Sequence, residues 1–194
     1  MRKAGNFWLI LLFMLAGCSD QTNETATGGT TSDPVEAEVV DAVTDIAEAT
    51  GRLAEKLRDD KATEQAHLTE GKAYLHINAE KPNVNVLETG LQFEILEQGD
   101  GKSPGPESNV VTHYHGTFIS GEVFDSSLER GEPAEFPVNR VIKGWTQALQ
   151  MMKEGDVWRI VIPPHLAYGK RGAGNTIPPD TVLVFEVELI EVKD

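Results

Sequence analysis

The sequence contains one cysteine and few basic residues. Only 17 of its 194 residues are Lys or Arg, against 31 Asp or Glu, and the formal net charge is −14. One cysteine allows neither an internal disulfide nor a zinc site built from several thiolates. A surface this acidic repels phosphate backbones, so we expect no nucleic-acid partner. With 40% hydrophobic and 25% charged residues, the chain has the composition of a globular protein.

Motifs for several kinds of catalysis are also missing. No G-x-S-x-G is present, and a lone thiol leaves nucleophilic hydrolysis without its usual parts. Gly101-Lys102-Ser103 has the end of a phosphate-binding loop, but the position where such a loop needs its first glycine is Leu96. His113 and His115 alternate on an expected strand, and no third ligand has a suitable spacing nearby. We therefore expect neither a bound metal nor a cofactor.

The first 17 residues have the pattern of an export signal. Arg2 and Lys3 precede an apolar run over residues 7–16, which is too short for a membrane-spanning helix of about 20 residues. The run closes on Leu15-Ala16-Gly17-Cys18, which resembles the lipobox of bacterial lipoproteins. This resemblance implies cleavage before Cys18 and its acylation as a membrane anchor. Ser19 at the next position implies sorting to the outer membrane, with the protein facing the periplasm. An ordinary signal with a chance cysteine is the alternative.

Two segments of different composition follow. Residues 18–34 hold no large apolar side chain after the cysteine and are rich in Thr, Ser, Gly and Asp, which predicts a flexible tether. Residues 35–82 are expected to form a helical arm that ends before Pro82. The arm carries a narrow apolar seam formed by Val39, Val43, Ile46, Leu53 and Leu57, whose spacing alternates between four and three residues if Thr50 takes the missing position. Such a seam suits a partner helix and a homodimer through residues 35–80. A helix that lies on its own domain or is solvated is the alternative.

From residue 83 to 194 the pattern changes to short β-branched stretches separated by Gly and Pro turns. The expected strands are 84–87, 91–97, 110–119, 157–162 and 181–192. One helix is clear, 144–152, where Trp145, Ala148, Leu149 and Met152 form a single apolar stripe. The predicted fold class is α+β: an antiparallel β-sheet of about five strands curled around one short helix, preceded by the N-terminal helical arm.

Aromatic residues of this segment fall on different strands, on turns and at the start of the helix. They include Tyr114, Phe124, Phe136, Trp145, Tyr168 and Phe185. A sheet curled around the helix could gather them as a shallow apolar cup, but aromatic residues are also the usual fillers of a core. The periodicity does not separate the two.

Five motifs in this segment resemble those of FKBP-type peptidyl-prolyl cis–trans isomerases. They are Thr112-His113-Tyr114-His115-Gly116, residues 121–127, Val141-Ile142-Lys143-Gly144-Trp145, Ala167-Tyr168-Gly169, and residues 177–187. The likeness runs from Gly90 to Val192. Upstream, residues 71–75 with Asn78, and then residues 89–93, resemble the connector in bacterial members of the macrophage infectivity potentiator type. Those members carry an N-terminal helical dimerisation arm.

The resemblance implies an isomerase that acts on Xaa–Pro bonds of exported proteins by desolvating and twisting the amide, without a cofactor. It also implies roles for single residues. Trp145 would be the floor under the proline ring. The apolar walls would be Tyr114, Phe124, Val141, Ile142 and Phe185. Asp125 would bond a wall aromatic and help to polarise the amide, the Ile142 N–H and the Tyr168 hydroxyl would hold substrate carbonyls, and Ile177 would lie in the loop that closes over the site.

Two positions depart from the family pattern. Ala134 stands where small single-domain members have a further aromatic wall, and Ala173 stands where they have a histidine. Other functions also remain open at this stage. The chain could be a periplasmic chaperone or binding module with weak turnover, or a surface lipoprotein that serves attachment.

Overall fold

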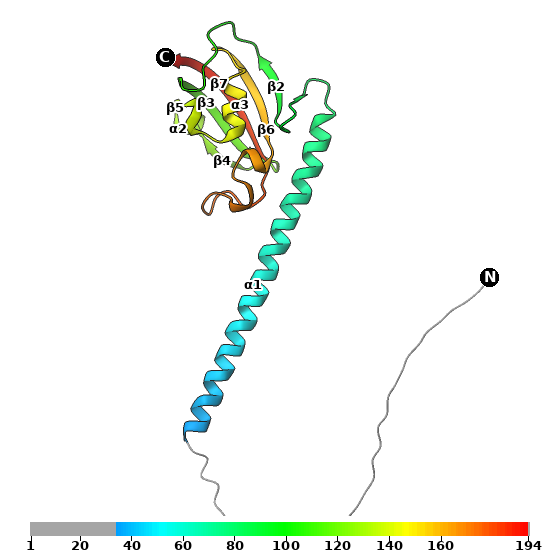
Figure 1. Ribbon diagram of the computed structural model, residues 1–194, viewed down its shortest axis with the longest axis vertical. Coiled ribbons are helices and arrows are strands. Elements are labelled where there is room, and N and C mark those ends of the chain that lie inside the picture. The colour runs from blue at the N-terminus through cyan, green and yellow to red at the C-terminus, as the bar shows by residue number, and fades with distance from the viewer. Residues whose placement is uncertain (1–33, 194) are drawn as a thin grey trace, which may run out of the picture. The chain divides into compact units, whose positions relative to one another are not determined.

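The computed structural model describes residues 34–193 (Figure 1). The expected signal peptide, the lipid anchor at Cys18 and the tether up to residue 33 lie outside the described residues. The chain forms two units, residues 1–47 and 48–194, and the site discussed below lies wholly within the second. No helix among the described residues has the length and apolar character needed to cross a membrane.

The elements follow one another as a long helix, a β-rich segment and a few short helices. In chain order they are α1 (Pro34–Ala79), β1 (Asn85–Val86), β2 (Gln92–Glu97), β3 (Asn109–Phe118), β4 (Val123–Ser126), α2 (Ser127–Arg130), β5 (Ala134–Pro137), η1 (Val138–Arg140), α3 (Lys143–Leu149), β6 (Val157–Ile162), η2 (Pro164–Leu166), η3 (Gly169–Arg171) and β7 (Leu183–Lys193). Helix α1 ends ahead of Pro82, as the restriction on the residue before a proline predicts.

The strands form one antiparallel sheet in the order β1-β2-β6-β7-β3-β4, with β5 paired to β3. This confirms the α+β class, but the sheet has seven strands where about five were expected. The two additions, β4 and β5, pair with different parts of β3, at residues 115–117 and 109–112. Each is four residues long, which is too short to show the alternation by which a strand is recognised in a sequence.

The core lies between α3 and the sheet, as the apolar stripe of the helix predicts. Trp145, Ala148, Leu149 and Met152 are each at most 4% exposed. The helix stops at Leu149, three residues before the expected end, and Met152 follows in a turn whose amide donates to the Ala148 and Leu149 carbonyls. The central strand β7 buries the predicted face at Leu183, Phe185, Val187 and Leu189 and exposes Glu186 and Glu188.

The end of α1 is joined to the sheet by a buried polar contact. Asn78 Nδ2 donates to Gln92 Oε1 at 2.9 Å, and Gln92 Nε2 donates to the Leu75 carbonyl at 2.8 Å. One turn earlier, a Cβ on Gly71 would lie 2.8 Å from Val182 Cγ2, so only glycine allows the helix to approach the start of β7 this closely. These contacts give a physical reason for the residue types of the connector.

The apolar seam on α1 is exposed where side chains are described. Ile46, Leu53 and Leu57 are 66%, 58% and 59% exposed. The side chains of Val39 and Val43 lie outside the described residues. Leu53 and Leu57 belong to the second unit, and their exposure shows that the rest of this unit does not cover them.

Glu154 joins the loop after β2 to the end of β7. Its carboxylate accepts from the Val192 amide at 2.6 Å and from the Lys102 amide at 3.3 Å. These bonds, that to Val192 foremost, lower the pKa of Glu154 from its usual 4.5. A lowered folded-state pKa stabilises the fold above about pH 4.5, and this contribution is lost as the pH falls through the folded-state pKa.

We therefore expect Glu154→Gln to lower the free energy of unfolding at neutral pH and to lose much of this effect in acid. Urea titrations of wild type and variant at about pH 7 and about pH 3.5 measure the difference. Glu88→Gln is the control, because Glu88 is exposed and has no hydrogen-bond or ion-pair partner among the described residues. A Glu154→Gln effect of equal size at both pH values would contradict the assigned role of the charge.

Candidate active site

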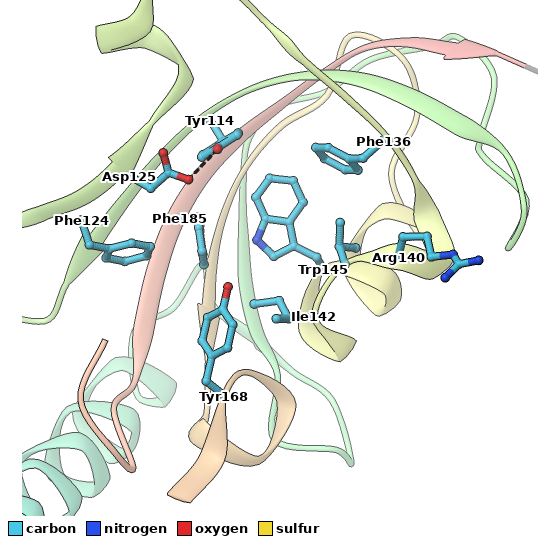
Figure 2. A pocket seen from close by; sticks show the side chains of 10 residues that line it. Tyr114, Phe124, Asp125, Phe136, Arg140, Ile142, Trp145, Tyr168 and Phe185 are labelled. Atoms are coloured by element: carbon cyan, nitrogen blue, oxygen red, sulfur yellow. Dashed lines mark hydrogen bonds between the residues drawn. The ribbon is translucent and has the colours of Figure 1, made fainter. Parts of the chain in front are cut away.

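A cavity of about 470 Å³ opens beside the start of α3. Figure 2 shows how side chains from separate elements surround it. The lining consists of Tyr114 from β3, Phe124 and Asp125 from β4, Phe136 from β5, Arg140 from η1, Val141 and Ile142 from the turn that follows, Trp145 from α3, Tyr168 from the segment between η2 and η3, and Phe185 from β7. Residues up to 71 positions apart in the chain therefore share one apolar cavity.

Trp145 is held at the base of this cavity by the edges of three other rings. Its centroid lies 5.4 Å from that of Tyr114, 5.4 Å from that of Phe136 and 5.2 Å from that of Phe185, with interplanar angles of 89°, 70° and 88°. Phe124 continues the wall, 5.3 Å from Phe185 in another edge contact. Edge-to-face pairs contribute about 0.5–1.5 kcal/mol each beyond area burial. Trp145 is 4% exposed, so it belongs to the core and also lines the cavity.

A hydrogen-bonded cluster stands on one side of the cavity. The Tyr114 hydroxyl donates to Asp125 Oδ2 at 2.6 Å, the dashed bond of Figure 2. Arg130 Nη2 donates to the same hydroxyl oxygen at 2.8 Å, and Arg130 Nη1 donates to Asp125 Oδ1. Burial, followed by the hydrogen bond to Asp125, raises the pKa of Tyr114 above its usual 10.0. The aspartate charge is therefore paired, and the tyrosine remains protonated.

Two serines, Ser126 at the end of β4 and Ser127 at the start of α2, hydrogen-bond the segment of β3 around Tyr114. Ser127 Oγ accepts from the Tyr114 amide at 2.7 Å and donates to the Tyr114 carbonyl at 3.2 Å. The histidines on either side of Tyr114 contact the same two serines. Nδ1 of His113 lies 3.0 Å from Ser127 Oγ, and Nδ1 of His115 lies 3.0 Å from Ser126 Oγ. Within residues 34–193, no group of three or more His, Cys, Asp or Glu side chains is placed to hold a metal ion.

Two hydrogen-bond donors belong to residues of the cavity lining. Ile142 precedes α3, and its carbonyl accepts the first bond of the helix from the Thr146 amide at 3.1 Å. Its own N–H is one of the donors that a helix start leaves unsatisfied. Tyr168 is 41% exposed, and its hydroxyl has no partner among the described residues. Burial, followed by the charge of Asp125, raises the pKa of Tyr168 above 10.0, so this hydroxyl is also a donor at neutral pH.

Comparison with known proteins decides the family. The family model described as "FKBP-type peptidyl-prolyl cis-trans isomerase" matches residues 101–190, and the one described as "Domain amino terminal to FKBP-type peptidyl-prolyl isomerase" matches residues 14–95. The crystal structure of a peptidyl-prolyl cis-trans isomerase from Pseudomonas syringae is similar at 40% sequence identity and a TM-score of 0.63. The match covers 67% of this chain and 96% of that one. The chain belongs to the FKBP-type isomerase family.

Two curated relatives extend this comparison. The FKBP-type 22 kDa peptidyl-prolyl cis-trans isomerase of Escherichia coli is 56% identical over 128 residues, which are 66% of this chain and 62% of that protein. The outer membrane protein MIP of Legionella longbeachae is 41% identical over 148 residues, which are 76% of this chain and 60% of that protein. The match thus spans about three fifths of the length of these relatives.

Eight of the nine pocket residues expected for an FKBP-type domain line the cavity, and Ile177 does not. Ile177 is 7% exposed and packs into the core instead. Its amide donates to the Ala173 carbonyl at 3.1 Å, and the Ala173 amide donates back at 2.8 Å. This two-way bridge closes the loop on itself and turns the Ile177 side chain inward.

Three residues of this FKBP-type site were not among the expected pocket residues. Phe136 is among the aromatic residues that the sequence singles out for either a cup or a core, but its strand β5 is too short to be predicted. Arg140 precedes the Val141-Ile142 motif and carries no apolar signal. Arg130 reaches Asp125 only because the single turn of α2, capped by Ser126 and ended by Gly131 at a φ of 77°, brings it back to β4.

Proposed function

We propose that this chain catalyses the cis–trans isomerisation of Xaa–Pro bonds in exported proteins. The observation that carries the proposal is the aromatic cavity based on Trp145, with two hydrogen-bond donors among its lining residues and no Ser, Thr, Cys, His or Lys side chain there. An Xaa–Pro amide needs no bond to be broken, because its barrier of about 18–20 kcal/mol comes from resonance between nitrogen and carbonyl. A site for this reaction needs a place for the proline ring and a means of favouring the twisted amide.

The roles of the residues follow from their chemistry. The proline ring would pack on Trp145 between the walls formed by Tyr114, Phe124, Val141, Ile142 and Phe185. An apolar surrounding disfavours the planar, more dipolar amide relative to the twisted transition state. The Ile142 N–H and the Tyr168 hydroxyl would hold substrate carbonyls on either side of the rotating bond. Asp125, paired to Arg130, would orient Tyr114 and add a local field at the amide. Ile177 would act only through the closed loop that it anchors.

The test is the rate of cis-to-trans relaxation of Xaa-Pro tetrapeptides, followed by exchange NMR. We expect kcat/KM to stay constant within about twofold between about pH 6 and 9. The reason is that the lining holds no His or Cys, and the raised pKa of both tyrosines keeps them protonated over this range. A bell-shaped profile centred near neutral pH would contradict the role given to the tyrosines. No acceleration by folded protein would favour the chaperone or binding module instead.

The finer domain organisation is proposed as residues 1–17 for a lipoprotein signal, 18–34 for a tether, 35–82 for the arm and 83–194 for the isomerase domain. We propose that the arm forms a homodimer through residues 35–80, because Leu53 and Leu57 of the seam are exposed. Sedimentation equilibrium of the chain from Cys18, with the cysteine replaced, should give a dimer mass. The Leu53→Glu, Leu57→Glu double variant should give a monomer. Wild type that stays monomeric at all concentrations would end this proposal.

We further propose that the protein is exported and anchored by lipid at Cys18 in the outer membrane, facing the periplasm. The lipobox pattern supports this, and the Legionella longbeachae relative is itself named an outer membrane protein. Fractionation of cells that express Cys18→Ser tests it, because this variant should appear in the soluble fraction. If the variant stays with the membranes, the anchor is elsewhere.

A further inference from the structure

The basic residues of the isomerase domain are concentrated beside the cavity. Nine Lys and Arg residues occur from residue 83 to 194, against 17 Asp and Glu. Five of the nine are in the lining or close to it. Arg140 lines the cavity, Arg130 bonds the lining residues Tyr114 and Asp125, and Lys143, Lys170 and Arg171 lie within three residues of Ile142 or Tyr168 in the sequence. More than half of the basic residues of this domain are therefore close to the cavity, although the net charge of the domain is negative.

Four of these five cations have no side-chain partner among the described residues, whereas Arg159 and Lys193 on other parts of the domain are paired. Arg159 bonds Glu94 and Glu186 across the sheet, and Lys193 bonds Glu135. By contrast, Arg140, Lys143, Lys170 and Arg171 form no ion pair or side-chain hydrogen bond with any residue in the range 34–193.

The carboxylates nearby do not neutralise these four. Asp125 is the acidic residue of the cavity lining, and it is already paired to Arg130. Asp180 comes close through its backbone, since its amide donates to the Gly169 carbonyl at 2.9 Å. Its carboxylate forms no ion pair with Lys170 or Arg171 among the described contacts. The positive charge beside the cavity is therefore available to a ligand.

Arg140 has the geometry to meet the peptide chain rather than the proline ring. It lines the cavity, and Figure 2 shows its guanidinium turned away from the Trp145 indole. Lys143 follows Ile142 directly in the sequence. On another segment of the lining, Lys170 and Arg171 follow Tyr168 within three residues, a span of at most about 11 Å. At moderate salt this distance is close to the Debye length of about 10 Å, so these charges still act at the cavity mouth.

We propose that Arg140, supported by Lys143, Lys170 and Arg171, selects substrates that carry a carboxylate on a residue flanking the proline. This inference rests on the proposed isomerase activity and adds a preference to it. A guanidinium on the edge of an apolar cavity binds a carboxylate through paired N–H donors, and complementary charge also speeds encounter. Because the groups are exposed, the expected preference is on the order of fivefold and decreases with salt.

The test compares Glu with Gln, which have nearly the same shape, in acetylated tetrapeptides, first before and then after the proline. Exchange NMR avoids a coupling protease with its own charge preference. At about 20 mM NaCl the wild type should turn over the preferred Glu peptide with a kcat/KM on the order of fivefold above that of its Gln counterpart. The ratio should fall toward one at about 500 mM NaCl.

Variants then assign the preference to the cavity. Arg140→Gln should lower the Glu/Gln ratio to about two or less, and Arg140→Glu should invert it. Lys153→Gln changes the net charge equally, and Lys153 is exposed and outside the cavity lining, so it should keep the wild-type ratio. Circular dichroism of each variant verifies the fold.

Three other outcomes would contradict the inference, each for a different reason. If wild type turns over both peptides equally at low salt, the isomerase proposal stands and the charge selection is wrong. If no peptide is turned over, the proposed function and this inference are wrong together. If Arg140→Gln keeps the ratio but loses binding to phosphatidylglycerol vesicles, the cations serve a lipid surface instead of the substrate.

Discussion

Trp145→Ala is expected to lower kcat/KM for a neutral Xaa-Pro peptide on the order of 100-fold. Trp145 forms the base of the cavity and is contacted by the edges of Tyr114, Phe136 and Phe185. Its removal leaves the proline ring without a surface and lets the three walls relax inward. Because Trp145 is also 4% exposed in the core, the variant should lose about 3–5 kcal/mol of unfolding free energy.

A second tryptophan separates these two effects. Trp158 is equally buried, at 3%, and stacks on Phe93 with centroids 4.5 Å apart and an interplanar angle of 10°, outside the cavity lining. Trp158→Ala should lose comparable stability but keep its activity per folded molecule. Relaxation rates are compared at a temperature where urea titrations show both variants folded. If both lose activity only in proportion to their folded fraction, Trp145 is a core residue alone.

The elements that the sequence predicted well are those whose pattern was long enough to be read. Strand β6 occupies residues 157–162 as expected, and the alternation of β7 places Phe185 and Val187 inside. The alternation ends near the C-terminus, where a register shift between β3 and β7 leaves Ile190 41% exposed and Val192 buried. A bulge of this kind depends on pairing with a strand far away in the sequence, so the local pattern does not reveal it.

The residues of the candidate site were likewise predicted only in part. Residue types alone left open whether the aromatics fill a core or line a cup, and Trp145 shows why, since it does both. The resemblance of the five motifs to the FKBP-type family predicted most of the lining residues. Arg130 and Arg140 had no such signal. Their relation to the cavity depends on two single turns, α2 between β4 and β5 and η1 between β5 and α3, and such short elements are hard to predict from a sequence.

Gly116→Ala is expected to displace two of the aromatic side chains that form the walls of the cavity. Gly116 lies on β3 opposite Phe185 of β7 and Asp125 of β4. A Cβ there would lie 2.8 Å from Phe124 Cζ and 2.9 Å from Phe185 Cε1, so both rings must shift. Overpacking of this kind costs about 1–3 kcal/mol of stability. The walls would move relative to Trp145, and kcat/KM should fall by about 10- to 100-fold.

Gly105→Ala is the matched control for this effect. A Cβ on Gly105 would lie 3.6 Å from Ser108 Oγ, an ordinary contact, so stability and kcat/KM should both stay close to wild type. Urea titration and peptide relaxation on the two variants measure the comparison, and near-UV circular dichroism reports the rearranged rings. A Gly116→Ala variant that is destabilised but fully active would mean that the rings yield away from the cavity. In that case the positions of Phe124 and Phe185 would not limit turnover, and catalysis would depend on the Trp145 surface and the donors beside it.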